Sequence, residues 1–200
     1  MKLKPWISKI HLWLGLSSGL VVFIVAVTGC IYAFQAEIQD LVQPYRFVDE
    51  VGETVLPPSE VWKIADEALP GKHLHGILYP QVENRAAQAI YYSFEDHYYY
   101  FVYVDQFTGK VLKVKDEFAD FFRIVLDGHF YLWLPQDIGQ PVVASFTLVF
   151  LVMVISGLIL WWPKKKKGVE KSFKIRWDAR WRRKNYDLHQ VLGFYVMIFA

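Results

Sequence analysis

Two histidines in this sequence have matching local surroundings. His11 is followed four residues later by Gly15, and a leucine precedes that glycine; His189 and Gly193 repeat the pattern. Residues at i and i+4 share a helix face, so each glycine leaves room on the face that carries the imidazole. A flat macrocycle between two helices needs such room, and an iron atom within it needs an imidazole from each side. This chemistry requires two helices that bring both histidines to the same depth.

Three apolar blocks, at residues 10–34, 142–162 and 188–200, are the elements available for this task. The first two are long enough for a helix to cross a hydrocarbon core of about 30 Å at about 1.5 Å per residue. We predict transmembrane helices over residues 10–35 and 140–162 and the start of a third over residues 186–200. The third block is too short to span, so we expect the sequence to be a fragment or to end abnormally.

Charge is strongly segregated, although the net charge is only +2. Residues 1–9 carry lysines and no acid, the loop at 163–185 is rich in Lys and Arg, and the segment between the first two spans is acidic. The positive-inside rule therefore places the N-terminus and the basic loop in the cytoplasm and residues 36–119 outside. Both histidines then enter the membrane from the cytoplasmic side, at the same depth.

A basic loop also suggests nucleic-acid binding. Here, however, Lys164 follows directly on a span that ends in Trp161 and Trp162. Interfacial Trp followed by Lys is the ordinary end of a membrane span, so we expect no nucleic-acid partner.

Cys30 is the single cysteine, which excludes an intramolecular disulfide. Residues 1–30 also resemble a lipoprotein signal peptide, whose cleavage would remove His11. The apolar run continues to Phe34, however, and is longer than the roughly 7 to 15 residues of a signal-peptide core. We therefore favour a transmembrane helix.

The outer segment, residues 36–119, has the pattern of a small α+β domain. Ser59 is the expected N-cap of a helix whose apolar stripe includes Val61 and Ala65, and Pro70-Gly71 ends it. Strand-like runs with β-branched and aromatic residues follow at 74–79, 87–94, 98–104 and 110–114. Turns are expected at 95–97 and 105–109. A core of about sixty residues is small, so we expect support from the membrane part.

Residues 120–139 are predicted to form an outer interfacial helix. Residues 120–134 are amphipathic and rich in aromatic side chains, include His129, and stop at Pro135. Topology places His129 at the membrane face opposite to His11, so the two cannot share one iron.

Part of the sequence is recognisable. The run from Val102 to Leu112 resembles the closing hairpin of PepSY domains, in which a strand ends in Asp, turns at Thr-Gly and returns. Embedded between apolar spans, with Ser156-Gly157 and Trp161-Trp162 near the end of the second, it resembles the PepSY-associated transmembrane family. These bacterial inner-membrane proteins include haem-binding reductases of ferric siderophores.

The resemblance implies a membrane α-helical bundle, three spans visible and the third truncated, with a small periplasmic α+β PepSY-like domain. It implies haem b ligated by His11 and His189, and a second, outer haem ligated by His129 and by a fourth span that the sequence lacks. The expected function is electron transfer from a quinol or cytoplasmic donor to a ferric siderophore or chelate in the periplasm, hence a transmembrane ferric-chelate reductase.

Alternatives remain at each of these positions. Gly15 and Gly19 also form a small-xxx-small helix-packing motif, with His11 hydrogen-bonded to a neighbour. A haem-free, membrane-anchored PepSY module that binds or regulates a periplasmic partner is the alternative function.

Other chemistry-bearing residues favour structural roles. His73 and His75, at i and i+2, suit a metal but lack a third ligand, so surface histidines are favoured. The tyrosines at 91, 92, 98, 99, 100 and 103 suggest cross-strand packing. No dinucleotide fingerprint, Walker loop, Ser-His-Asp order or Cys-x-x-Cys is present, so no nicotinamide or ATP site is expected.

Overall fold

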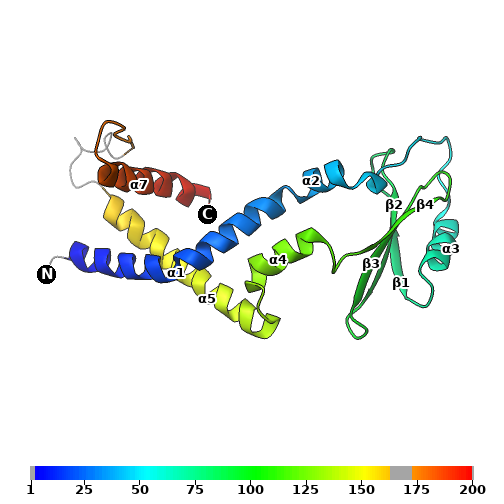
Figure 1. The fold of residues 1–200 in the computed structure, drawn as a ribbon, viewed down its shortest axis with the longest axis horizontal. Coiled ribbons are helices and arrows are strands. Elements are labelled where there is room, and N and C mark those ends of the chain that lie inside the picture. The colour runs from blue at the N-terminus through cyan, green and yellow to red at the C-terminus, as the bar shows by residue number, and fades with distance from the viewer. Residues whose placement is uncertain (1–2, 163–172, 200) are drawn as a thin grey trace. The chain divides into compact units, whose positions relative to one another are not determined.

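The computed structural model describes residues 3–162 and 173–199. The chain divides into two compact units: Met1–Val27 with His129–Ala200, here the helical unit, and Thr28–Gly128, here the sheet unit. Figure 1 follows the helices and strands along the chain. Lys164–Lys167 and Lys171 of the predicted basic loop lie outside the described residues.

Two helices in the described part of the chain are long and apolar enough to cross a membrane. They are α1 (Leu3–Ala33) and α5 (Gln136–Trp161). In the most apolar 18-residue stretch of α1 only 11% is buried within the protein, and in that of α5 only 6%. A core helix of a soluble protein would be buried, whereas these exposed apolar surfaces fit contact with lipid. The helix α1 continues past Cys30, as a span requires.

The third predicted span is represented by α7 (Trp181–Phe199), which begins before residue 186. Its first turns are polar, and Arg183 donates to Asp187 one turn later at 2.7 Å. An i,i+4 ion pair of this kind stabilises helical turns before the apolar part of α7. The start of this helix therefore lies earlier than the sequence patterns predicted. The described part of α7 is not apolar enough along its length to be identified as a membrane span, so the third crossing stays a prediction.

The segment before α5 also differs from expectation. The structure has α4 at Phe121–Tyr131, and α5 begins at Gln136 rather than at residue 140. Pro135 is the N-cap of α5, with an extended backbone, and the two positive-φ residues Leu132 and Trp133 separate the helices. The predicted interfacial segment is therefore one helix, a turn and the first residues of α5.

The sheet unit confirms the predicted helix and four strands. The sheet is antiparallel in the order β1-β2-β3-β4, and the helix α3 packs on one face. Pro57 rather than Ser59 is the N-cap of α3, and Ser59 lies inside the helix. Pro58 occupies the first helical position, for which its fixed φ is well suited. The elements of this unit are α2 (Gln35–Val42), η1 (Pro44–Arg46), α3 (Pro58–Ala68), β1 (Leu74–Leu78), β2 (Ala87–Ser93), β3 (Tyr98–Val104) and β4 (Val111–Asp116).

The core of the sheet unit follows from strand alternation. Val61 and Ala65 of α3 pack against the residues of β2 and β3 that point to the same side, such as Ala89 and Val102. On the opposite face Tyr103 packs with Val48 and Ala86, and burial raises the pKa of Tyr103 to about 12. At the end of β3, Asp105 accepts hydrogen bonds from Phe107 and Thr108, which fixes the predicted hairpin turn. The tyrosine pairs Tyr91–Tyr100 and Tyr92–Tyr99 face each other across β2 and β3, as expected for cross-strand packing.

A buried ionic cluster lies where β4 is followed by α4. Lys115 contacts Glu117 at 2.8 Å and Asp120 at 2.9 Å, and the Lys115 and Asp120 side chains are only 8% and 7% exposed. Asp120 also accepts a hydrogen bond from the backbone N–H of Phe122 at 2.8 Å and so caps the start of α4. The cluster therefore fastens the first turn of α4 to the sheet.

Candidate functional site

The structure brings the imidazoles of His11 and His189 together. His11 lies on α1 and His189 on α7, and their ring centres are 6.2 Å apart with planes inclined by 68°. His11 is half-buried and His189 is exposed on the protein surface. Two side chains from opposite ends of the sequence thus form one pair within the helical unit.

Ser156 of α5 holds the His11 ring. Its Oγ lies 2.8 Å from Nδ1 of His11 and donates its proton to the carbonyl of Met153 at 3.1 Å. Because a hydroxyl has only one proton, the serine oxygen accepts from His11, and Nδ1 carries the hydrogen. The Nε2 atom of the neutral ring then holds a lone pair, which is the form that binds a metal.

The glycines of the pair have different surroundings. A Cβ on Gly193 would meet no heavy atom within 4 Å, which fits the predicted gap. A Cβ on Gly15 would lie 2.9 Å from the methyl carbon of Met153, so this glycine serves helix packing, as the alternative interpretation proposed. A Cβ on Gly157 would lie 3.3 Å from Cε1 of His11, so this glycine lets the ring approach α5.

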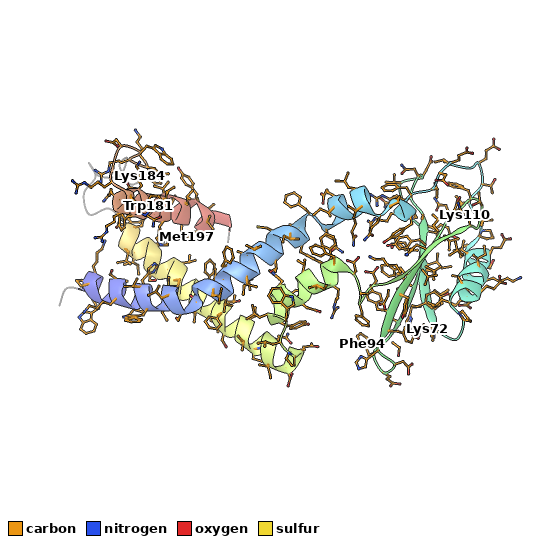
Figure 2. The ribbon with its side chains drawn as sticks, in the orientation of Figure 1. Lys72, Phe94, Lys110, Trp181, Lys184 and Met197 are labelled. Atoms are coloured by element: carbon orange, nitrogen blue, oxygen red, sulfur yellow. The ribbon has the colours of Figure 1, made fainter. Side chains whose placement is uncertain are left out.

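An aromatic cluster fixes α7 against α5. Trp161 stacks on Phe194 with ring centres 4.3 Å apart, and Phe173 contacts both rings edge-on at 5.1 Å. Phe194 lies just over one helical turn after His189, so the cluster sets the position of that imidazole. Figure 2 shows Trp181, Lys184 and Met197 along the same helix. The roles of Ser156 and Phe194 were missed from sequence, because they depend on which helix faces which.

His129 lies beside a different part of α1 from His11. Its Nδ1 donates to the backbone carbonyl of Val25 at 2.9 Å. Since a carbonyl only accepts, Nδ1 carries the hydrogen and Nε2 the lone pair. Val25 lies about four turns, or roughly 20 Å, further along α1 than His11. His129 therefore belongs to the other end of the helical unit, and its role as a haem ligand stays a prediction.

The spacing of the two rings would allow His11 and His189 to hold one haem iron. With metal–nitrogen bonds of about 2 Å, and ring centres about 1 Å further out, two imidazoles on opposite sides of one metal have ring centres roughly 6 Å apart. The observed value is 6.2 Å. Among residues 3–162 and 173–199, no group of three or more His, Cys, Asp or Glu side chains is placed to hold a metal ion. A haem brings its remaining ligands with it, so two imidazoles are what it would require of the protein.

The other histidines lie in the sheet unit. His97 occupies the β2–β3 turn with a positive φ of 50°. His73 and His75 are exposed but ordered, and their rings stack with centres 4.8 Å apart.

Comparison with known proteins agrees with this architecture. No curated protein matches the sequence. Residues 8–200 match the family described as the PepSY-associated TM region, which covers nearly the whole chain. In this chain, α1 and α5 are the helices long and apolar enough to span a bilayer, and most of the sheet unit lies between them in sequence. The chain is a membrane protein that belongs to the PepSY-associated TM region family.

Proposed function

We propose that this protein is a transmembrane electron carrier in the bacterial inner membrane, in which His11 and His189 hold one haem b. The pairing of these two imidazoles from distant helices, 6.2 Å apart, is the observation that carries the proposal. When bound, haem b supplies reversible one-electron chemistry at its iron. The protein's part is ligation, orientation and exclusion of water.

Each helix contributes a defined part of this arrangement. Ser156 keeps the proton on Nδ1 of His11, which leaves Nε2 as the ligand atom. Gly157 permits the close approach of that ring to α5, and the Trp161–Phe194 stack holds α7 in place. The apolar side chains around the pair would lower the local dielectric, which is one of the factors that set the reduction potential of a haem.

The proposed acceptor is a ferric siderophore or another ferric chelate on the side of the sheet unit. One electron from a quinol or cytoplasmic donor converts one Fe(III) to Fe(II), which binds hard oxygen ligands less firmly and is released. The proposed orientation has the N-terminus in the cytoplasm and the sheet unit in the periplasm, following the positive-inside rule. His129 is proposed as a ligand of a second haem near the periplasmic face.

A haem-free module that binds a periplasmic partner is the second candidate. The observation that favours it is the Met153 methyl, which fills the face of Gly15 that a macrocycle would otherwise occupy.

A visible absorption spectrum separates the two functions. The full-length protein is expressed with a haem supply, purified in detergent and reduced with dithionite. The electron-carrier proposal expects a Soret band and split low-spin α and β bands, and a His97→Asn control should retain them. A spectrum without these bands would reject the haem proposal and leave the haem-free module.

A further inference from the structure

A groove lies where the start of α1 meets the end of α5. It has a volume of about 440 Å³ and is lined by Lys4, Leu158, Ile159 and Trp162, all of the helical unit. Three of these side chains are apolar, and the ammonium group of Lys4 supplies the only charge among them. The groove therefore combines one cation with an apolar wall.

The end of α5 fixes the position of the Lys4 amine. Its Nζ atom donates to the backbone carbonyl of Trp162 at 3.3 Å. Trp162 is the C-cap of α5, and the last carbonyl groups of a helix attract cations. An ammonium group has three N–H donors, so this contact leaves two of them for another partner. Lys4 thus holds the helix end and can still bind an anion.

The apolar wall lies at the boundary of the expected hydrocarbon region. Ile159 and Trp162 are 43% and 64% exposed, at the end of a helix that is long and apolar enough to cross a membrane. Tryptophan is typical of this boundary, because its ring prefers an apolar region while its N–H reaches polar groups. The groove is therefore placed where lipid headgroups join their acyl chains.

The surroundings of the groove are basic. Phe173 contacts Trp161 with ring centres 5.1 Å apart, which brings the start of the following segment to the same end of α5. In residues 173–187 Lys and Arg outnumber Asp, and Asp187 is already paired with Arg183 at 2.7 Å. Figure 2 labels Trp181 and Lys184 in this segment. The local charge therefore favours an anionic ligand.

We propose that this groove binds an anionic phospholipid, with the headgroup phosphate at Lys4 and an acyl chain along Ile159 and Trp162. A free phosphate ion would gain the amine alone and would lose hydration against the apolar side chains, whereas a phospholipid matches both parts of the groove. Basic pockets between membrane-spanning helices bind acidic lipid headgroups in other proteins. The site needs no haem and no electron transfer, so it goes beyond the proposed function.

The test is native mass spectrometry of the full-length protein in detergent, titrated with dioleoyl phosphatidylglycerol or with zwitterionic dioleoyl phosphatidylcholine. Lys4→Gln removes the positive charge but keeps an N–H donor for the Trp162 carbonyl. Trp162→Ala removes the indole and keeps that carbonyl. The matched control is Lys9→Gln, which removes the same charge from an exposed position of α1 that lies about 140° around the helix from Lys4.

The parent protein and Lys9→Gln should bind the first phosphatidylglycerol molecule more tightly than phosphatidylcholine. Lys4→Gln should lose about fivefold in affinity for phosphatidylglycerol, the effect of one cation beside a lipid phosphate. It should lose less for phosphatidylcholine, whose choline group already offsets the phosphate charge. Trp162→Ala should weaken the binding of both lipids, and circular dichroism checks that the helices of each variant stay folded.

Three results would overturn the proposal. The first is a parent protein that shows no preference for phosphatidylglycerol. Equal losses of affinity in Lys4→Gln and Lys9→Gln would reduce the effect to a general attraction between a basic surface and acidic lipid. Displacement of the bound phosphatidylglycerol by excess inorganic phosphate would identify a simple anion site instead of a lipid site.

Discussion

The two histidine pairs of this protein differ in how their rings are arranged. His11 and His189 come from helices at opposite ends of the sequence, with ring centres 6.2 Å apart, as for ligands on opposite sides of one metal. His73 and His75 lie at the start of one strand, and their rings stack with centres 4.8 Å apart and planes only 26° apart, so their in-plane lone pairs do not converge on one atom. In His11, His73 and His75 the contact of Nδ1 with an oxygen acceptor leaves the lone pair on Nε2. Ring orientation as well as ring spacing therefore decides whether two neighbouring histidines can bind one metal ion.

The largest expected effect is the loss of haem from the helical pair. His189→Ala should abolish the haem at this site as completely as His11→Ala does, because a bis-imidazole iron loses its low-spin state when either ligand is removed. Haem content per protein and the reduced α band provide the measurement. Full haem content in either variant would reject the proposal that His11 and His189 bind one haem. The 6.2 Å contact between the rings would then be explained by helix packing alone.

The next effect concerns the sheet unit alone. Lys115→Met leaves Glu117 and Asp120 buried without their cation, which costs about 3 kcal/mol of folding stability by analogy with other broken buried pairs. Denaturant unfolding followed in the sheet unit measures the loss. Lys113→Met, an exposed neighbour on the same strand, is the control and should change stability little. Haem content should stay unchanged if the two units act separately.

Acid should act through the same cluster. Burial alone would raise the pKa of Asp120, but the hydrogen bonds from Lys115 and from the Phe122 N–H hold it below its usual value. A carboxyl with a lowered folded-state pKa contributes stability above its unfolded pKa and loses it as pH falls through the folded pKa. The sheet unit should therefore weaken below about pH 4, and Lys115→Met should show a shallower acid dependence than the parent. Equal slopes in the two proteins would show that the pair does not set the acid sensitivity.

Much of the sheet unit was predictable because its signals are local. The strand runs and the turns at 95–97 and 105–109 follow from period-two alternation and turn chemistry, and both survive in the structure. The start of α3 was predicted two residues late, because Ser59 was taken as the N-cap whereas Pro58 occupies the first helical position, which proline prefers. The stack of His73 and His75 was missed, since the bulge between Leu74 and Gly76 depends on the pairing register rather than on spacing.

The helical pair was predictable for a different reason. The repeat of His11 and Gly15 at His189 and Gly193 indicated a partnership, and the two rings do lie together. The equivalence of the two glycines did not follow, because Gly15 faces Met153 whereas Gly193 is open. Which side chain fills a gap depends on the rotation of α5, which sequence periodicity does not encode.

Ser156→Ala should weaken the helical pair without destroying it. The change removes the acceptor of the His11 Nδ1–H, so the ring loses its fixed tautomer and orientation. Loss of such a supporting hydrogen bond lowers metal affinity by about 10- to 100-fold in other proteins. Haem dissociation and the midpoint potential are the measurements, since a merely structural role would leave the potential unmoved. Ser156→Thr keeps the hydroxyl and should restore both; failure of this rescue would argue against a positioning role.

The smallest expected effect on the helical pair comes from His129→Ala. His129 donates to Val25, about four turns along α1 from His11, so its removal should leave the haem of His11 and His189 intact. The signal of a second haem should disappear in His129→Ala. The variant His129→Gln keeps a hydrogen-bond donor to the Val25 carbonyl, here called the tether between α4 and α1, but removes the imidazole. Spectra of the two variants then divide the alternatives: loss of the second signal in both indicates a ligand, and retention in His129→Gln alone indicates the tether. Loss of all haem in His129→Ala would show that the two ends of the helical unit do not act independently. It would contradict the assignment of His129 to a different haem from that of His11 and His189.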